Sequence, residues 1–376
     1  MKHGGVTHMS GEENGLFGWF RKLFRGASAA ATLPRRSRPG AAPASGPESA
    51  GAAETSDAWS EYAPGLAAHA RSVGLVFQLP PPPSAAQLEQ VEQLAAALLQ
   101  GAASEDAAPN SLPAACLRML NLAARSDVEI SELASAIHQD PALTAAVLRA
   151  ANSASQGAAG GPIHTVRDAV LRLGVTESAR VAGAVAAKAL FSPRSKSSQA
   201  LFSTQFADLN VAAASAAGGS AYLAMDRGVG RSDLAYLGGM LHDVGKSLAL
   251  SSLANLILAG RAPRDLDPEI LQQLLERTHV ELGTLAHERW ALPAYLTELC
   301  AASHDAHVPE SPAHAELHLV RVVSGLLALR TRPQPLERLH ELEQSIVALR
   351  ITPLQARALD SELRARSSQV RNVLGV

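Results

Sequence analysis

The stretch GGMLHDVGKSL, from Gly238 to Leu248, combines an adjacent imidazole and carboxylate with a Gly-Lys pair. His242 and Asp243 are residue types that hold divalent cations. Neighbouring residues on a helix point about 100° apart, so these two side chains alone do not enclose an ion. The Gly-Lys pair lacks the full glycine-rich loop of a phosphate cradle, so we interpret Lys246 as a salt-bridging or helix-terminal lysine. We therefore interpret this stretch mainly as a marker of the fold. Any metal site here would need further ligands from other parts of the chain.

Helical signals surround this stretch on both sides. The 376-residue chain is 47% apolar but only 4% aromatic, and runs of Val, Ile and Tyr are rare, which favours a core built from helices. Upstream, Asp140 is a helix cap followed by Pro141 at the first helical position. Thr165 to Asp168 has the pattern of a capping box. We therefore predict an all-α protein. Its downstream helices are expected at residues 202–226, 233–243, 268–279, 282–290, 293–303, 315–330, 335–348 and 353–373.

Residues 1–83 are predicted to form a disordered, low-complexity arm, because Ala, Gly, Ser and Pro dominate much of this segment and bury little apolar surface. Within the arm, residues 15–26 place bulky apolar side chains from Leu16 to Phe24 on one helical face and basic side chains mostly on another. That pattern suits a membrane surface or a groove on a partner protein. The alternative is a tail fragment that orders only against its own domain or not at all. After a polyproline spacer, a leading helix is expected over residues 84–104.

Charge and cysteine content narrow the possible function classes. The formal net charge of −2 gives no overall electrostatic reason to expect nucleic acid as a partner. Cys116 and Cys300 lie in apolar helical patterns and are expected to be core residues of a reduced protein. No run approaches the roughly 20 apolar residues of a membrane-spanning helix, and the N-terminus lacks the pattern of a signal peptide. We expect a cytoplasmic protein that contacts the inner membrane, if at all, through residues 15–26.

Several sequence blocks follow one another in a specific order. They are DPALTAAVLRAANS at Asp140–Ser153, Ile163–Gly174, LHDVGK at Leu241–Lys246, His279–Gly283, Trp290–Pro293 and Ser303–Asp305. Together they resemble the HD-related output domain (HDOD) family over about residues 112–329. The resemblance implies an all-α bundle related to the metal-dependent HD phosphohydrolases. It also implies a role in bacterial signal output, in which most members act by binding partners. We expect the HDOD domain at residues 105–330, with C-terminal helices packed on it at 331–376.

The resemblance also implies a ligand set against which the chain can be compared. A working HD hydrolase holds its metal with a His, the His-Asp pair and a distant Asp, all from different helices. In this chain the first of these positions falls near Asp208 and the last near Ser324. A carboxylate can replace an imidazole as a ligand for Mg²⁺ or Mn²⁺, but a neutral hydroxyl contributes little. His279 and His304 stand where related enzymes place second-metal or substrate histidines. The set is thinner and less anionic than a hydrolase normally uses.

We therefore expect a non-catalytic signal-transduction module that acts by protein–protein interaction with a regulatory partner. No catalytic residue and no cofactor is expected, and any divalent metal would occupy a vestigial site at His242 and Asp243. One alternative is a metal-dependent HD-type phosphohydrolase acting on a nucleotide or cyclic dinucleotide. Another is a regulator that binds a nucleotide without hydrolysing it. The expected remnant pocket consists of Asp208, His242, Asp243, Lys246, His279 and His304.

Overall fold

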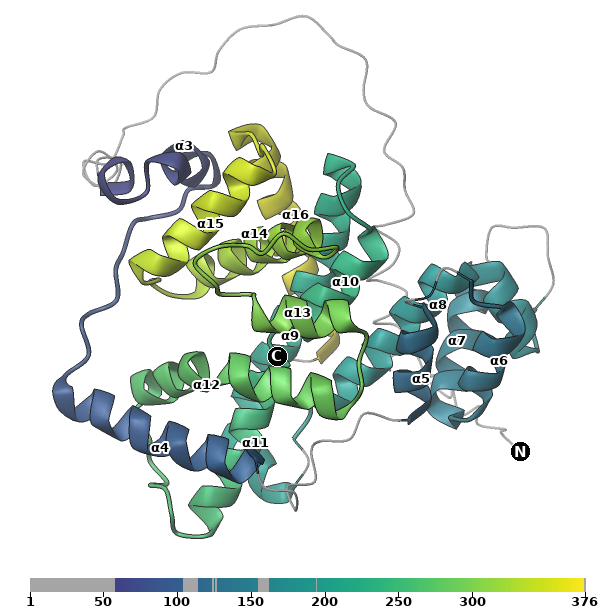
Figure 1. Ribbon diagram of the computed structural model, residues 1–376, viewed down its shortest axis with the longest axis horizontal. Coiled ribbons are helices and arrows are strands. Elements are labelled where there is room, and N and C mark those ends of the chain that lie inside the picture. Colours follow the sequence, from purple (N-terminus) through teal and green to yellow (C-terminus); the bar gives the residue numbers. More distant parts are fainter. Residues whose placement is uncertain are drawn as a thin grey trace, which may run out of the picture.

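The computed structural model describes residues 58–103, 114–123, 125, 127–154, 162–193 and 195–374. In these residues every regular element is a helix, which confirms the prediction of an all-α protein (Figure 1). The helices are α3 Pro64–Val73, α4 Ala85–Ala103, α5 Ala114–Ala123, α6 Ile130–His138, α7 Pro141–Ala154, α8 Val166–Leu190, α9 Lys196–Arg227, α10 Ser232–Leu241, α11 Val244–Leu258, α12 Pro268–Arg289, α13 Ala294–Ala301, α14 His314–Thr331, α15 Leu336–Ala348 and α16 Pro353–Leu374. Among them, none is both long enough and apolar enough to cross a bilayer. The amphipathic segment 15–26 lies outside the described residues.

The long helix α9 connects three apolar clusters. One cluster joins α5–α8 to α9, α10 and α13, a second joins α3 to α14–α16, and a third joins α4 to α11 and α12 (Figure 1). From α9, Ala217 enters the first cluster, Leu223 the second and Phe206 the third. Residues 213–221 of this helix, AASAAGGSA, are all buried, and such small side chains allow neighbouring helices to approach closely. Helix α9 is thus the central packing surface of the protein.

The disordered arm was predicted to extend to residue 83, but residues 58–74 are largely helical. They form a short helical segment followed by α3, and Trp59 is only 2% exposed, with its ring centroid 5.0 Å from that of Phe77. The carbonyl oxygen of Val73 accepts a hydrogen bond from Nη2 of Arg330 at 2.8 Å. Trp59 belongs to an apolar cluster that also contains residues of α14, α15 and α16, more than 200 positions later in the chain. Local composition carries no sign of such a partner, and for this reason the sequence-based prediction was wrong here.

Helix α12 is continuous where the sequence predicted two helices, at 268–279 and 282–290. It lies directly against α11, because both helices have a glycine at the contact. A methyl group on Gly245 would lie 2.8 Å from the backbone nitrogen of Gly283, and one on Gly283 would lie 2.7 Å from Sγ of Cys300. Neither position has room for a side chain. This close crossing brings the first turn of α11 against the turn of α12 that carries His279.

Candidate functional site

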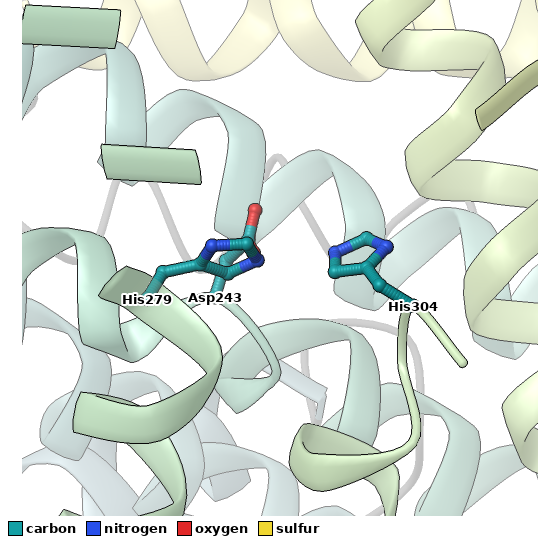
Figure 2. A group of neighbouring side chains, drawn as sticks. All are labelled: Asp243, His279 and His304. Carbon is teal, nitrogen blue, oxygen red and sulfur yellow. The ribbon is translucent and has the colours of Figure 1, made fainter. Parts of the chain in front are cut away.

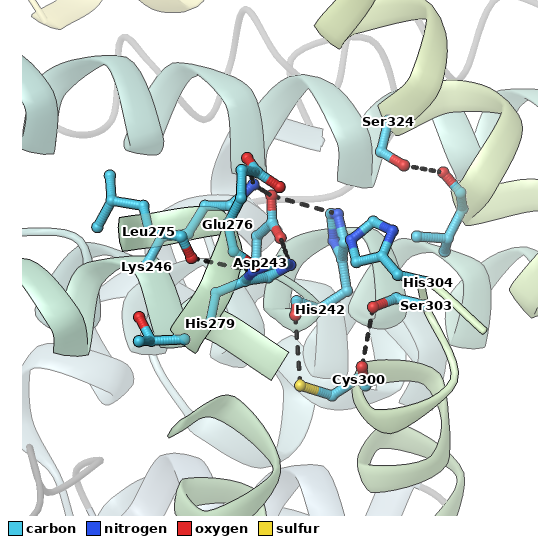
Figure 3. Close-up of polar contacts among 12 residues, drawn as sticks. His242, Asp243, Lys246, Leu275, Glu276, His279, Cys300, Ser303, His304 and Ser324 are labelled. Atoms are coloured by element: carbon cyan, nitrogen blue, oxygen red, sulfur yellow. Dashed lines mark hydrogen bonds and ion pairs between the residues drawn. The ribbon is translucent and has the colours of Figure 1, made fainter. Parts of the chain in front are cut away.

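The His-Asp pair lies at the junction between α10 and α11. His242 caps the end of α10, where its Nδ1–H donates to the carbonyl oxygen of Gly239 at 3.1 Å. The thiol of Cys300 donates to the His242 carbonyl oxygen at 3.3 Å (Figure 3). Asp243 is the first residue before α11. The two helices are each held by a close glycine contact, since a methyl on Gly239 would overlap the backbone of α9. The pair is therefore rigidly placed on packed helices.

Three side chains from different parts of the chain converge at this junction. They are Asp243 before α11, His279 within α12 and His304 in the loop after α13 (Figure 2). One ligand-type atom from each lies within 4.8 Å of the other two. Oδ1 of Asp243, Nε2 of His279 and Nε2 of His304 are all buried, and none has a hydrogen-bond partner in the described part of the chain. Buried polar atoms are normally satisfied, so this grouping calls for a water or an ion.

The proton of His279 can be placed from its hydrogen bonds. Its Nδ1 lies 3.0 Å from the carbonyl oxygen of Leu275 and 2.9 Å from that of Glu276. Both oxygens are acceptors, so Nδ1 carries the hydrogen and Nε2 presents a lone pair. Burial, followed by the charge of Lys246, lowers the pKa of His279 to about 4, so the ring is neutral near pH 7. The lone pair then faces Oδ1 of Asp243 at 3.5 Å, an arrangement of two acceptors that a cation or a bridging water would relieve.

His304 is oriented by a carboxylate. Its Nδ1 lies 3.2 Å from Oε2 of Glu341, and the same oxygen accepts from Nη1 of Arg338 at 3.0 Å. Burial raises the pKa of Glu341 to about 7, against the opposing charges of Arg338 and Arg321. When Glu341 is ionised, it accepts the Nδ1–H of His304, which leaves Nε2 as a lone pair. The ring of His304 packs edge-on against that of His279, with centroids 5.0 Å apart.

Lys246 forms ion pairs with the carboxylates of Asp243 and Glu276. Its Nζ lies 2.8 Å from Oδ2 of Asp243 and 3.1 Å from Oε1 of Glu276 (Figure 3). Burial by itself would raise the pKa of Asp243, but the charges of Lys246, His242 and His279 outweigh burial, and the pKa lies below its usual range. Nε2 of His242 is 3.7 Å from Oδ2 of Asp243, on the side shared with the lysine. Lys246 thus pairs with Oδ2 of Asp243, whereas Oδ1 has no hydrogen-bond partner in the described residues.

Glu276 is surrounded by positive charge. Besides Lys246, it accepts from Nη2 of Arg332 at 2.6 Å and lies 3.3 Å from Nη2 of Arg338. Burial would raise the pKa of Glu276, yet these charges, led by that of Lys246 and joined by His279, lower it to about 2. The carboxylate is therefore ionised at neutral pH and fully paired with cations of the chain itself.

These side chains line one pocket together with Ser303 and Ser324. The predicted pocket residues His242, Asp243, Lys246 and His304 all line it, and His279 lies buried at its edge, in contact with Asp243. Ser324 lies in the pocket wall, and its hydroxyl donates to the carbonyl oxygen of Val320 at 2.8 Å.

Asp208 is a correction to the predicted pocket. Its Oδ1 accepts from Nη2 of Arg371 at 3.0 Å, and its side chain is 53% exposed. The residue lies on the face of α9 that meets the C-terminal end of α16, whereas the pocket lies between α12, α14 and α15. The order of the sequence blocks placed Asp208 on the correct helix, but it did not determine whether its side chain lies on the face of α9 toward the pocket. The pocket therefore lacks the carboxylate that the sequence suggested.

Five charged residues that the sequence did not identify complete the pocket wall. Glu276 lies one turn before His279 on the same helix, and this i, i+3 spacing was a local signal that could have found it. No motif marks the other four, Arg321, Arg332, Arg338 and Glu341. The last three lie beyond residue 330, where we expected the domain to end.

The three converging atoms fit a divalent cation chemically. Two neutral imidazole nitrogens and one carboxylate oxygen form a donor set typical of Zn²⁺ and related transition ions. Each histidine donates its other ring N–H to a fixed acceptor, as metal-ligating histidines generally do. The ligands expected from the sequence were His242 and Asp243. In the structure Asp243 faces His279 and His304, while His242 lies beside the lysine-bound oxygen.

Comparisons with known proteins relate this fold to one family. A family model for the HDOD domain matches residues 110–306. A candidate metal-dependent phosphohydrolase from Shewanella amazonensis SB2B has a similar structure, with a TM-score of 0.56 and 18% identity over 75% of this chain and 99% of that one. A candidate signal transduction protein from Marinobacter aquaeolei VT8 gives a TM-score of 0.52 and 22% identity, over 77% of this chain and 65% of that one. At these identities the structural matches support the fold alone. The search of curated proteins returned no match.

Proposed function

This chain belongs to the HDOD family, and from that premise we propose that it is a signal-output module that binds a regulatory protein and does not hydrolyse phosphate esters. The proposal places it in the bacterial cytoplasm, without nucleic acid as a partner. Any contact of residues 15–26 with the inner membrane would be peripheral. The pocket described above would then serve stability rather than turnover.

The charge balance of the pocket carries this proposal. Metal-dependent hydrolysis needs a cation that lowers the pKa of a bound water, and anionic ligands hold that cation in place. Here the ammonium of Lys246 lies 2.8 Å from Asp243 and 3.1 Å from Glu276, and Arg332 and Arg338 also pair with Glu276, so both carboxylates have cationic partners within the chain. The hydroxyl of Ser324 occupies the wall where a further carboxylate was expected, and it is engaged with backbone. Lys246, Arg332 and Arg338 thus supply much of the positive charge that a metal ion supplies in a hydrolase.

Turnover assays test the absence of hydrolysis. The full chain, supplied in turn with Mn²⁺, Zn²⁺ and Mg²⁺, should cleave neither bis(p-nitrophenyl) phosphate nor cyclic dinucleotides above the rate of buffer. A partner protein captured by crosslinking should be retained by the Asp243→Asn variant, because the proposed interaction does not use the pocket chemistry. Asp305→Asn is the matched control, since Asp305 is exposed and lies outside the pocket lining. Metal-dependent turnover that disappears in Asp243→Asn but persists in Asp305→Asn would show that the protein is an enzyme.

A second candidate function is divalent cation binding, favoured by the three unpartnered atoms of Asp243, His279 and His304. A cation there would link the start of α11, the middle of α12 and the loop after α13. It would supply Lewis acidity at open coordination positions, but Lys246 beside the same carboxylate opposes its charge. We infer a regulatory or structural cation rather than a hydrolytic centre.

Calorimetric titration of chelator-treated protein tests this second candidate. Co²⁺ or Zn²⁺ should bind as one ion per chain, and His279→Ala or His304→Ala should each weaken binding by more than about 100-fold, the upper end of the loss typical for supporting residues. His307→Ala is the control, because His307 lies exposed in the same loop as His304. Wild-type protein that takes up no ion, or histidine variants that bind as tightly as the control, would exclude the cation site.

A further inference from the structure

His304 is the one member of the converging group that lies in a loop. Asp243 and His279 are held by α11 and α12, which cross at contact distance. His304 lies between the end of α13 and the start of α14. Loop backbones move more freely than helices, so a side chain aimed into a site from a loop needs additional support. The described contacts supply that support from two directions, and both come from the C-terminal helices.

Arg321 of α14 holds the backbone on both sides of His304. Its Nη2 donates to the carbonyl oxygen of Ala302 at 2.7 Å and to that of Asp305 at 2.6 Å. The arginine is only 4% exposed, so these charge-assisted hydrogen bonds are shielded from competing water. The two carbonyls bracket His304 in the chain, and one guanidinium group therefore fixes the short loop that presents the imidazole.

Glu341 of α15 holds the ring. Its Oε2 accepts from Nη1 of Arg338 at 3.0 Å and lies 3.2 Å from Nδ1 of His304. An oxygen that accepts from an arginine is well suited to accept a second N–H, and this fixes His304 in the tautomer with hydrogen on Nδ1. Nε2 is then left free of hydrogen, on the side where Asp243 and His279 converge.

We propose that Arg321 and Glu341 are positioning residues for His304, and that α14 and α15 complete a site whose converging side chains all lie within the family segment. The match to the HDOD model ends at residue 306, whereas both positioning residues lie after it. The metal part of this inference rests on the second candidate function above. The orientation of His304 does not, because it follows from contacts within the chain.

The orientation is tested first, in metal-free, full-length protein. Long-range ¹⁵N NMR of the imidazole at about pH 8, where an ordinary histidine is neutral, should give the Nδ1–H tautomer for His304. Its signal is assigned by its loss in His304→Gln. Glu341→Ala should shift the ring to a mixture of tautomers. Glu341→Gln keeps an acceptor oxygen and should restore the wild-type tautomer. Glu337→Ala is the control, since Glu337 lies exposed on the same helix.

The affinity for Co²⁺ is the second measurement. Glu341→Ala should weaken binding by about 10-fold to 100-fold, the range typical for loss of a residue that supports a ligand. Arg321→Lys should have an effect in the same direction, because a lysine does not reproduce the fork that reaches two carbonyls. Glu337→Ala should bind as wild type does.

The outcomes separate the two proposals. Failure of wild-type protein to bind Co²⁺ removes the cation site, and the tautomer of His304 then decides the positioning roles alone. A wild-type tautomer in Glu341→Ala overturns the role of Glu341, whether or not metal binds. If Glu341→Ala does not fold, loss of the Nδ1–H tautomer in Arg321→Lys supports the inference, and its persistence there contradicts it.

Discussion

The Gly245→Ala variant is expected to lose about 3 kcal/mol or more of its free energy of unfolding, at or beyond the upper end of what overpacking usually costs. The added methyl would overlap the carbonyl oxygen of His279 and lie 2.7 Å from its carbonyl carbon. These are backbone atoms of a packed helix, so no side chain can rotate away to make room. Relief requires α11 and α12 to separate, which would also move Asp243 away from His279. Urea denaturation followed by circular dichroism measures the loss.

Gly101→Ala is the matched control for this variant. Gly101 lies in α4, and a methyl group there would meet nothing within 4 Å. The same substitution should therefore stabilise the protein by about 0.5–1 kcal/mol, because alanine loses less backbone entropy than glycine in a helix. Equal stability of wild type and Gly245→Ala would contradict the close crossing of α11 and α12.

The Lys246→Met variant should be destabilised by about 3 kcal/mol near pH 7, since removing one partner of a buried ion pair leaves an uncompensated charge. The lysine side chain is 13% exposed and pairs with both Asp243 and Glu276. Glu276 keeps Arg332 and Arg338, so Asp243 bears most of the loss. Lys188→Met, at an exposed position, should change stability by no more than about 0.5 kcal/mol.

The pH dependence of this difference provides a second check. The pKa values of both carboxylates are lowered in the folded protein, that of Glu276 from 4.5 to about 2. A lowered carboxyl pKa contributes stability above the pKa of the unfolded chain, and this contribution is lost as the pH falls through the folded value. The gap between wild type and Lys246→Met should therefore be largest above about pH 4.5 and should shrink toward pH 2. Denaturation midpoints measured across this range would reveal a constant gap if the lysine acted only through packing.

Several local features followed from the sequence because local chemistry sets them. Thr165 caps α8 as its pattern predicted, with the Asp168 N–H donating to Oγ1 of Thr165 at 3.1 Å, while the Asp168 carboxylate accepts from the Thr165 hydroxyl. Asp140 caps α7 through the N–H of Leu143 at 2.8 Å. Such contacts span only three residues, so spacing along the chain is enough to predict them.

Other predictions failed where distant segments had to meet. Trp59 shares an apolar cluster with residues of α14–α16, and Asp208 pairs with Arg371. Glu341 contacts His304 from 37 positions away, on a helix that no motif marks. Side-chain types and spacing do not encode which helix faces are apposed, because that depends on the packing of the whole chain.

The sequence was enough to predict an all-α protein and to identify the His-Asp pair as part of its family signature, because helix periodicity, capping and the order of the motif blocks are properties of the chain. Which atoms are paired around His242 and Asp243 depended on the tertiary structure. It placed Lys246 on one oxygen of Asp243 and left the other oxygen facing two imidazole lone pairs. The contrast between the two oxygens of Asp243 is energetically important because the residue is largely buried. In a low-dielectric interior each charge and lone pair needs a polar partner, and only folding brings such partners within reach.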